Sequence, residues 1–244
     1  MQLSLAALRA VVFDLDGTVV DNMALHAEAF AAFNARHGLP PLTASDRARL
    51  DGRRNSELFP LLFGRDMEPE ESAIYETEKE SLYRELSRGR LTPLPGVVDL
   101  LDRLDARGIA IALATSAPAP NIVHTLHELG LTDRFPVIVR GDEVPNGKPA
   151  PDVFLAAAGR AGADPRCCLA FEDAPMGVAA AKAAGMVCGA VTTSFSAAHL
   201  MALPQPPDFT CRDFEEFLAV RLAPETTDVD HCVQTITRAP SASM

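Results

Sequence analysis

The chain has 244 residues, of which 48% are hydrophobic, and its formal net charge is −11 at pH 7. This length and composition favour a globular protein with one large α/β domain, or with a core domain that carries a smaller insertion. The negative charge argues against a nucleic-acid partner, because proteins held by phosphate-backbone electrostatics normally present a basic face.

The N-terminal segment does not have the pattern of an export signal. The apolar run at residues 3–8 is interrupted by Arg9 before a signal-peptide core can form, and no run in the chain approaches the length of a membrane span. A cytoplasmic protein without membrane contact is therefore expected.

The first predicted strand is the apolar run at residues 10–15, which leads into the sequence DLDGT, Asp14 to Thr18. Two carboxylates spaced by two residues share one face of an extended chain, and Gly17 allows the backbone to turn sharply out of the sheet. Such carboxylates repel each other and raise each other's pKa unless a cation or a hydrogen-bonding substrate joins them. An Asp-rich turn at the end of a strand is the alternative interpretation of these residues alone.

After Asp21 the strand signals stop and helical patterns replace them. Helices are predicted at residues 23–37, 43–51, 56–62 and 70–88. We therefore predict an all-helical cap at residues 21–92, inserted after the first strand and placed over the carboxyl end of the sheet, where ligands bind in open α/β folds. The acidic stretch 66–80, whose only base is Lys79, is expected to be mostly a solvated helix face.

Beyond the insertion, strands and helices alternate, which is typical of an α/β fold with a parallel sheet. Strands are predicted at residues 109–115, 137–139, 167–171, 187–191 and 208–211. The helices between them begin near a proline and end at a glycine, as from Pro175 to Gly185. The catalytic core is predicted to span residues 1–20 and 93–221, and residues 222–244, rich in Pro, Ser and Thr, are predicted to form a disordered tail.

The cysteines of this region do not show a metal-binding pattern. No CxxC or Cys/His ligand spacing is present, which argues against a structural zinc site, and reduced thiols are expected. The five residues are Cys167, Cys168, Cys188, Cys211 and Cys232.

Polar residues follow four of the predicted strands. They are Asp14 and Asp16 after the first, Thr115 and Ser116 after the second, Lys148 after the third, and Glu172 and Asp173 after the fourth. Carboxylates, one lysine and hydroxyls at a helix start suit an oxygen-liganded cation together with a small tetrahedral anion. Mg²⁺ fits because a few carboxylates hold it while it keeps water ligands for a substrate phosphate. A small phosphorylated molecule is therefore the expected partner.

This arrangement predicts phosphoryl transfer through a carboxylate. An ionised Asp14 can attack phosphorus to form an aspartyl-phosphate, which divides a difficult displacement into two easier steps. Asp16, partly protonated by its neighbours, would give a proton to the leaving alcohol and later take one from water. Lys148 and the metal would offset the charge on the phosphoryl oxygens, while Ser116 or Thr115 fixes their orientation.

The four motifs resemble those of the haloacid dehalogenase-like superfamily of phosphotransferases. They read FDLDGT at residues 13–18, ATS at 114–116, GKPAPD at 147–152, and FEDA with PMGVAAAKAAGM at 171–186. The resemblance implies a Rossmann-like three-layer core with a helical cap inserted after the first strand. It also implies that Asp14 is the nucleophile and Asp16 the acid/base. The resemblance covers nearly all of the chain from Ala10 to Phe217.

The same resemblance implies the ligand sets. Mg²⁺ would be held by Asp14, by the backbone carbonyl of Asp16 and by Asp173, with Glu172 in or near the outer shell. Ser116 and Lys148 would bind the phosphoryl group.

Within the superfamily, the chain is most similar to the branch that contains β-phosphoglucomutase and related sugar-phosphate phosphatases. His26 lies where that branch carries a cap-hinge histidine, which suits a proton relay, although a packing role is the alternative. Thr18 lies where the mutases commonly have Val or Ile. In the mutases an arginine of the cap binds the distal phosphate, and its position falls near Asn55 in this sequence. Simple hydrolysis is therefore the preferred prediction.

We therefore predict a magnesium-dependent phosphatase for a small metabolite, with a sugar or polyol phosphate favoured, and a monomer or homodimer. Arg53, Arg54 and Lys79 are cap bases that can read the substrate, with solvated surface charge as the alternative. A sugar-phosphate mutase is the second hypothesis, and a regulatory module that accepts a phosphoryl group on Asp14 is the third. Asp16 argues against the third, because an acid/base there turns the adduct over. Dehalogenase chemistry is disfavoured, because it uses a lone Asp without metal carboxylates.

Overall fold

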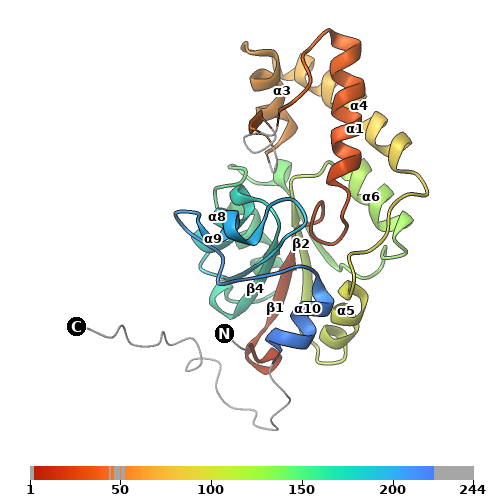
Figure 1. Ribbon diagram of the computed structural model, residues 1–244. Helices are drawn as coiled ribbons and strands as arrows, with labels where there is room; N and C mark the ends of the chain where they lie inside the picture. Colours follow the sequence, from red (N-terminus) through yellow and green to blue (C-terminus); the bar gives the residue numbers. More distant parts are fainter. Residues whose placement is uncertain (1–2, 44, 47–49, 51–52, 223–244) are drawn as a thin grey trace.

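The computed structural model describes residues 3–43, 45–46, 50 and 53–222 (Figure 1). A parallel six-stranded sheet with the order β3-β2-β1-β4-β5-β6 forms its centre. The strands are β1 (Ala10–Phe13), β2 (Ala110–Thr115), β3 (Val137–Arg140), β4 (Cys168–Glu172), β5 (Val187–Val191) and β6 (Phe209–Cys211). The predicted parallel sheet is confirmed. Its first strand ends before Leu15, because the chain turns out of the sheet at Gly17, where φ is 80°.

Helices cover both faces of the sheet, which confirms the predicted three-layer core (Figure 1). The face that includes Val11 and Phe13 packs its large side chains against α5 (Val97–Asp105), α6 (Ala119–Glu128) and α10 (Phe214–Glu216). The opposite face, which includes Ala10 and Val12, has small side chains and packs against α7 (Asp152–Arg160), α8 (Pro175–Ala183) and α9 (Ala197–Met201). Short turns complete the core: η1 (Leu5–Ala7), η2 (Gly141–Glu143), η3 (Pro165–Cys167) and the π-helical turn η4 (Phe217–Arg221). Alternation of side chains along each buried strand produces the two layers.

A helical cap stands over the carboxyl end of the sheet (Figure 1), as predicted. It contains α1 (Met23–His37), α3 (Asn55–Phe63) and α4 (Pro69–Ser87), and its interior is aromatic. The Phe33 and Phe59 rings lie 5.4 Å apart, and Tyr75 stacks on Phe63 at 4.6 Å. The cap leaves and re-enters the core at one place, since Leu94 N–H donates to the Val19 carbonyl at 2.9 Å.

Two predicted segments fall largely outside the described residues. They are most of the helix expected at 43–51 and the tail beyond Leu222, which includes Cys232. The four cysteines within the described part of the chain are free thiols. In that same part, no helix combines the length and the apolar character that crossing a membrane requires.

The prediction of a solvated helix face for residues 66–80 is wrong at the C-terminal end of this stretch. Lys79 is 3% exposed and Glu80, the next residue, is 4% exposed. Both lie on α4 where this helix reaches across the junction between cap and core, and Glu80 accepts a hydrogen bond from Asn121 of α6. Residues of α1 in the cap contact Lys79, and Asn121 of the core contacts Glu80. A charge pattern along one helix contains no information about such neighbours.

Candidate active site

The register of the sheet brings the ends of β1 and β4 together. Phe13 pairs with Phe171 in the parallel ladder, and the Asp14 N–H donates to the Phe171 carbonyl at 2.9 Å. Glu172 is the last residue of β4 and Asp173 follows it, so three carboxylates meet at one edge. One oxygen from each of Asp14, Glu172 and Asp173 lies within 4.8 Å of the others, and all three residues are buried.

Lys148 is the cation that joins two of these carboxylates. Its Nζ donates to Asp14 Oδ1 at 2.7 Å and to Glu172 Oε1 at 2.6 Å. Burial by itself would lower the pKa of Lys148, but the two carboxylates outweigh burial and hold the pKa above its usual value. The lysine is therefore charged at neutral pH.

The three carboxylates carry more negative charge than one lysine can offset. Burial, helped by the charge of Glu172, raises the pKa of Asp14 to about 7 against the opposing effect of Lys148. Burial and the charges of Glu172 and Asp14 also hold the pKa of Asp173 well above its usual range. A divalent cation would remove this repulsion, and carboxylate oxygens are the ligands that Mg²⁺ prefers. The donor set therefore fits a magnesium ion.

The carboxylate oxygens of Glu172 and Asp173 differ in the hydrogen bonds that they accept. Glu172 Oε2 accepts from the backbone N–H groups of Asp173 at 3.0 Å and Ala174 at 3.1 Å, while Oε1 accepts from Lys148. Asp173 Oδ2 accepts from the Ser194 hydroxyl. Asp14 and Asp173 are therefore the residues that would hold a metal, and Glu172 fixes Lys148 and the start of the loop after β4.

Gly17 makes room for Asp173. A Cβ at residue 17 would lie 2.1 Å from Asp173 Oδ2, and the φ of 80° is strained for any residue with a side chain. The Thr193 hydroxyl, next to Ser194, donates to the Gly17 carbonyl. The loop after β5 therefore fastens both the DLDGT turn and the carboxylate of Asp173.

We expect Gly17→Ala to weaken Mg²⁺ binding more than tenfold, because the new Cβ displaces the carboxylate of Asp173. Isothermal titration calorimetry with MgCl₂ measures the affinity. Gly38→Ala is the matched control: φ is 65°, and no atom lies within 4 Å of the added Cβ. Gly38→Ala should cost about 1 kcal/mol of stability and leave the Mg²⁺ affinity unchanged. Equal Mg²⁺ affinities in both variants would contradict the assignment of Asp173 as a ligand.

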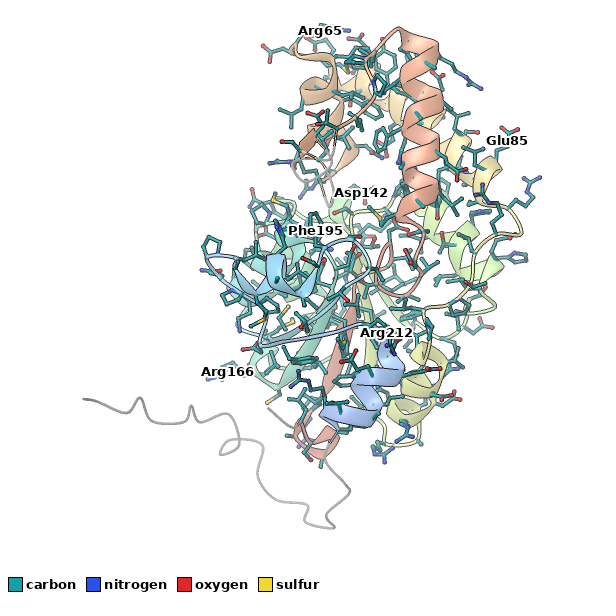
Figure 2. The ribbon with its side chains drawn as sticks, in the orientation of Figure 1. Arg65, Glu85, Asp142, Arg166, Phe195 and Arg212 are labelled. Atoms are coloured by element: carbon teal, nitrogen blue, oxygen red, sulfur yellow. The ribbon has the colours of Figure 1, made fainter. Side chains whose placement is uncertain are left out.

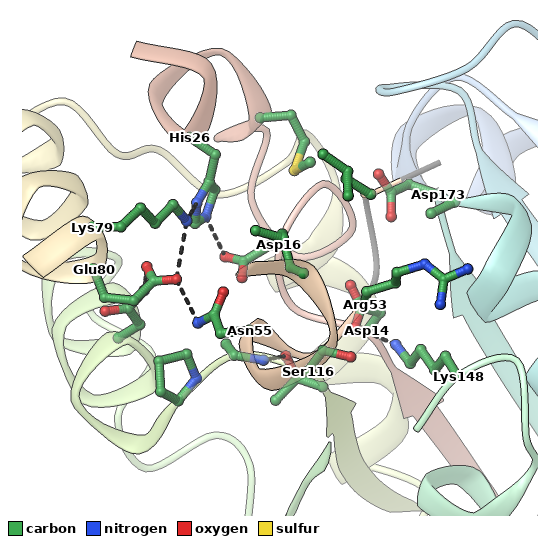
Figure 3. A pocket seen from close by; sticks show the side chains of 18 of the residues that line it. Asp14, Asp16, His26, Arg53, Asn55, Lys79, Glu80, Ser116, Lys148 and Asp173 are labelled. Atoms are coloured by element: carbon green, nitrogen blue, oxygen red, sulfur yellow. Dashed lines mark hydrogen bonds and ion pairs between the residues drawn. The ribbon is translucent and has the colours of Figure 1, made fainter. Parts of the chain in front are cut away.

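Asp16 points toward the cap instead of the three-carboxylate cluster (Figure 3). Its Oδ1 accepts from Asn22 Nδ2 at 2.6 Å and faces His26 Nε2 at 3.6 Å. Burial favours the neutral acid, but the charge of His26 and the hydrogen bonds outweigh it and hold the pKa of Asp16 below its usual value. The partial protonation expected from neighbouring acids is therefore wrong for the substrate-free protein, because the cap surrounds Asp16 with cations and donors. The carboxylate of Asp16 lies outside the cluster, and the metal contact predicted for its backbone carbonyl stays a prediction.

His26 connects Asp16 to a buried lysine. Lys79 Nζ lies 3.1 Å from His26 Nδ1, and Nε2 of the same imidazole faces Asp16. The imidazole stacks on Tyr83 with centroids 3.9 Å apart and an interplanar angle of 7°. Asn22, which binds Asp16, also donates to the Tyr83 hydroxyl at 2.6 Å. The position of the acid/base candidate is thus set by residues of α1 and α4.

The cap bases have different surroundings. Arg53 and Asn55 line the cavity with Asp14, Ser116 and Lys148 (Figure 3). Arg54, predicted as a substrate contact, is not among the lining residues. Its guanidinium donates to the carbonyl oxygens of Val144 at 3.1 Å and Pro145 at 3.4 Å. Lys79 lines the cavity and is buried, so the alternative of a solvated surface charge does not apply to it.

Glu80 is a cavity residue that the sequence analysis did not identify. It accepts from Lys79 at 3.0 Å, from Asn55 at 2.8 Å and from Asn121 at 2.6 Å. Asn22 was also missed, because Asn before a helix is typical of an N-cap, whereas here its side chain makes no cap hydrogen bond and binds Asp16. No sequence signal distinguishes an Asn that caps a helix from one that binds a catalytic candidate.

Thr115 and Ser116 also line the cavity, where β2 leads into α6. The Thr115 hydroxyl oxygen accepts from the Ala117 N–H at 3.0 Å, so Thr115 shapes the loop that presents Ser116. The predicted phosphate-binding residues and the three carboxylates therefore surround one cavity.

Comparison with known proteins gives a consistent result. Residues 8–185 match the haloacid dehalogenase-like hydrolases. A phosphorylated carbohydrates phosphatase from Thermotoga maritima is 34% identical over 73% of this chain and 82% of its own length. A β-phosphoglucomutase from Bacillus subtilis is 35% identical over 73% of this chain and 81% of its own length.

A solved structure is also similar to this fold. It is that of a variant of CbbY from Rhodobacter sphaeroides in complex with xylulose-(1,5)bisphosphate, with a TM-score of 0.77 and 25% identity over 88% of this chain and 100% of that one. The matched region contains the four motifs, and the structure places their polar residues around one cavity. The chain therefore belongs to the haloacid dehalogenase-like hydrolase family.

Proposed function

We propose that the protein is a magnesium-dependent phosphatase that hydrolyses a small phosphorylated metabolite, with a sugar or polyol phosphate as substrate, through an aspartyl-phosphate on Asp14. One observation carries this proposal: Asp14, Lys148 and Asp173 meet at the sheet edge while Asp16 lies between them and the cap. A nucleophile, a charge-compensating lysine, metal ligands and an acid/base then surround one phosphoryl position.

The residues divide the reaction between them. Asp14 attacks phosphorus, and Lys148 together with Ser116 binds the phosphoryl oxygens. Bound Mg²⁺ would supply charge stabilisation for the phosphoryl group, held by Asp14 and Asp173. Asp16 is ionised in the substrate-free protein, and the negative charge of a bound phosphate favours its protonation, since a like charge nearby raises the pKa of a carboxyl group. It can then protonate the leaving alcohol and afterwards accept a proton from the attacking water.

The cap side of the cavity supports a hydroxyl-rich substrate. Its wall contains polar side chains that are hydrogen-bonded to one another: Lys79, Glu80 and Asn121 are buried, and Asn55 is half-buried. A substrate with hydroxyl groups can exchange hydrogen bonds with such a wall, whereas an apolar group would leave its buried polar atoms unpaired. The relative from Thermotoga maritima, which is named as a phosphatase of phosphorylated carbohydrates, supports the same substrate class.

The test is phosphate release from a panel of phosphorylated metabolites that contains sugar 1-phosphates, sugar 6-phosphates, polyol phosphates and, as a contrast, phosphorylated alcohols without further hydroxyls. We expect release from a hydroxylated member with MgCl₂, and a loss of more than about 100-fold with EDTA that excess Mg²⁺ restores. Equal activity with and without EDTA, or preference for the apolar phosphates, would contradict the proposal.

A sugar-phosphate mutase is the second candidate, because Arg53 adds another cation to the cavity that Asp14 and Lys148 line (Figure 3). An arginine there can hold a second phosphate. Feeding a sugar 1-phosphate separates the two functions by product: a phosphatase yields free sugar and inorganic phosphate, and a mutase yields the 6-phosphate. We expect the first result.

A further inference from the structure

The cap residue Arg54 is bound by the core. Its two hydrogen bonds to the carbonyl oxygens of Val144 and Pro145 reach the loop that leads to Lys148, and Arg54 is the N-cap of α3. One side chain therefore joins the start of a cap helix to the loop that carries the lysine of the active site.

Gly147 provides the space that Arg54 occupies. A Cβ at Gly147 would lie 2.6 Å from Arg54 Nε and 3.0 Å from Glu57 Oε1. Gly147 is not among the glycines with positive φ, so its backbone does not require glycine. The reason for a glycine directly before Lys148 is thus the close approach of the cap, and Arg54 is the group that approaches.

The neighbours of Arg54 face the other way. Arg53 and Asn55 both line the cavity, and Arg54 between them does not. We propose that Arg54 is a positioning residue: by docking on the Val144 and Pro145 carbonyls, over Gly147, it holds the cap closed and presents Arg53 and Asn55 to the substrate. Its kinetic consequence depends on the proposed phosphatase function, but the docking itself does not.

The strength of the contact suits a reversible latch. Hydrogen bonds from a guanidinium are stronger than neutral ones, but this side chain is 18% exposed and the core groups that accept its hydrogen bonds are neutral carbonyls. The ion pair of Arg54 Nε with Glu57 Oε1, at 3.8 Å, lies within the cap. Lid opening has to occur in every turnover to release product, so a very strong latch would slow the enzyme.

Removing the latch should act on KM. If Arg54→Ala lowers the fraction of closed molecules, the apparent affinity for substrate falls by the same factor, whereas saturating substrate still closes the cap. We expect KM to rise about tenfold and kcat to change less than about threefold. Arg65→Ala is the matched control, because Arg65 lies on the cap far from the core (Figure 2) and pairs with Glu71. Its kinetic constants should equal those of the wild type.

A double-mutant cycle tests whether Gly147 serves Arg54. Gly147→Ala alone should raise KM to a similar degree, because its Cβ displaces the guanidinium. In Arg54→Ala/Gly147→Ala the nearest colliding atom is gone, so the double variant should resemble Arg54→Ala alone. The proposal would be overturned if the KM increases of the two single variants multiplied in the double variant, or if Gly147→Ala lowered kcat by a larger factor than it raised KM. Gly147→Ala would then act directly on Lys148.

Hydrogen exchange gives a readout that does not depend on turnover. The amides of Val144, Asn146 and Gly147 and of the first turn of α3 should exchange faster in Arg54→Ala and Gly147→Ala than in the wild type and Arg65→Ala. Thermal unfolding shows that each variant is folded. Unchanged exchange in folded variants would refute the latch. Absence of phosphate release by the wild type would instead refute the proposed phosphatase, and exchange would still decide the latch.

Discussion

Asp14→Asn should abolish phosphate release, with kcat/KM reduced by about 10⁴-fold or more, because an amide cannot attack phosphorus. The variant keeps the shape of the side chain, and its amide oxygen can still accept the hydrogen bond from Lys148 that the wild type makes at 2.7 Å. A steady-state assay of phosphate release with Mg²⁺ measures the loss. Robust turnover by this variant would reject Asp14 as the nucleophile.

Thermal unfolding of the same variant in EDTA shows whether the loss is chemical. Burial raises the pKa of Asp14 to about 7 from an ordinary value near 4, so the carboxyl group binds its proton more tightly in the folded protein. Between pH 4 and pH 7, ionisation of Asp14 therefore lowers the free energy of unfolding of the wild type as the pH rises. Above pH 7 this destabilisation by the buried carboxylate is fully present. Asn cannot ionise, so at pH 8 the Tm of Asp14→Asn should equal or exceed that of the wild type. A much lower Tm would mean that inactivity reflects misfolding.

The position of the site was predictable from the sequence because apolar strands end where polar residues begin. The run at residues 10–13 and the strand that ends at Glu172 are buried on both faces, and parallel strands present their carboxyl ends at one edge. Proline and glycine likewise marked most helix ends, although α5 begins at Val97, two residues after the nearest proline, since Gly96 adopts φ of 79°. The core and the candidate catalytic residues that follow its strands were therefore predictable from local patterns.

The side-chain arrangement in the cap was not predictable in the same way. Arg53 and Arg54 are adjacent and chemically identical, yet one lines the cavity and the other binds carbonyl oxygens of the core. Lys79 and Glu80 belong to an acidic stretch, and their burial depends on α4 meeting His26 and Asn121. Such partners lie far apart in the sequence, and helical periodicity describes only which face of its own helix a residue occupies.

Asp16→Asn should lower kcat about 10³-fold for an alkyl phosphate, because the leaving alcohol then departs without a proton. The loss should be much smaller for the first step with p-nitrophenyl phosphate, whose leaving group is a stable phenolate. The second step still lacks the base that activates water, so the phosphorylated enzyme should accumulate. A burst of p-nitrophenol, together with a mass increase of one phosphoryl group on the intact protein, measures this.

The control for this variant is Asp21→Asn, which removes the same charge from an exposed position close by in the sequence. It should retain wild-type kcat and show no accumulated phosphoenzyme. If Asp16→Asn lost equal activity with both leaving groups and trapped no phosphoryl group, Asp16 would act by holding the cap residues Asn22 and His26. If Asp16→Asn traps the phosphoryl group and the double variant Asp14→Asn/Asp16→Asn does not, the phosphoryl group is on Asp14, because only a carboxylate that attacks phosphorus can carry the adduct. Proton transfer is then assigned to Asp16.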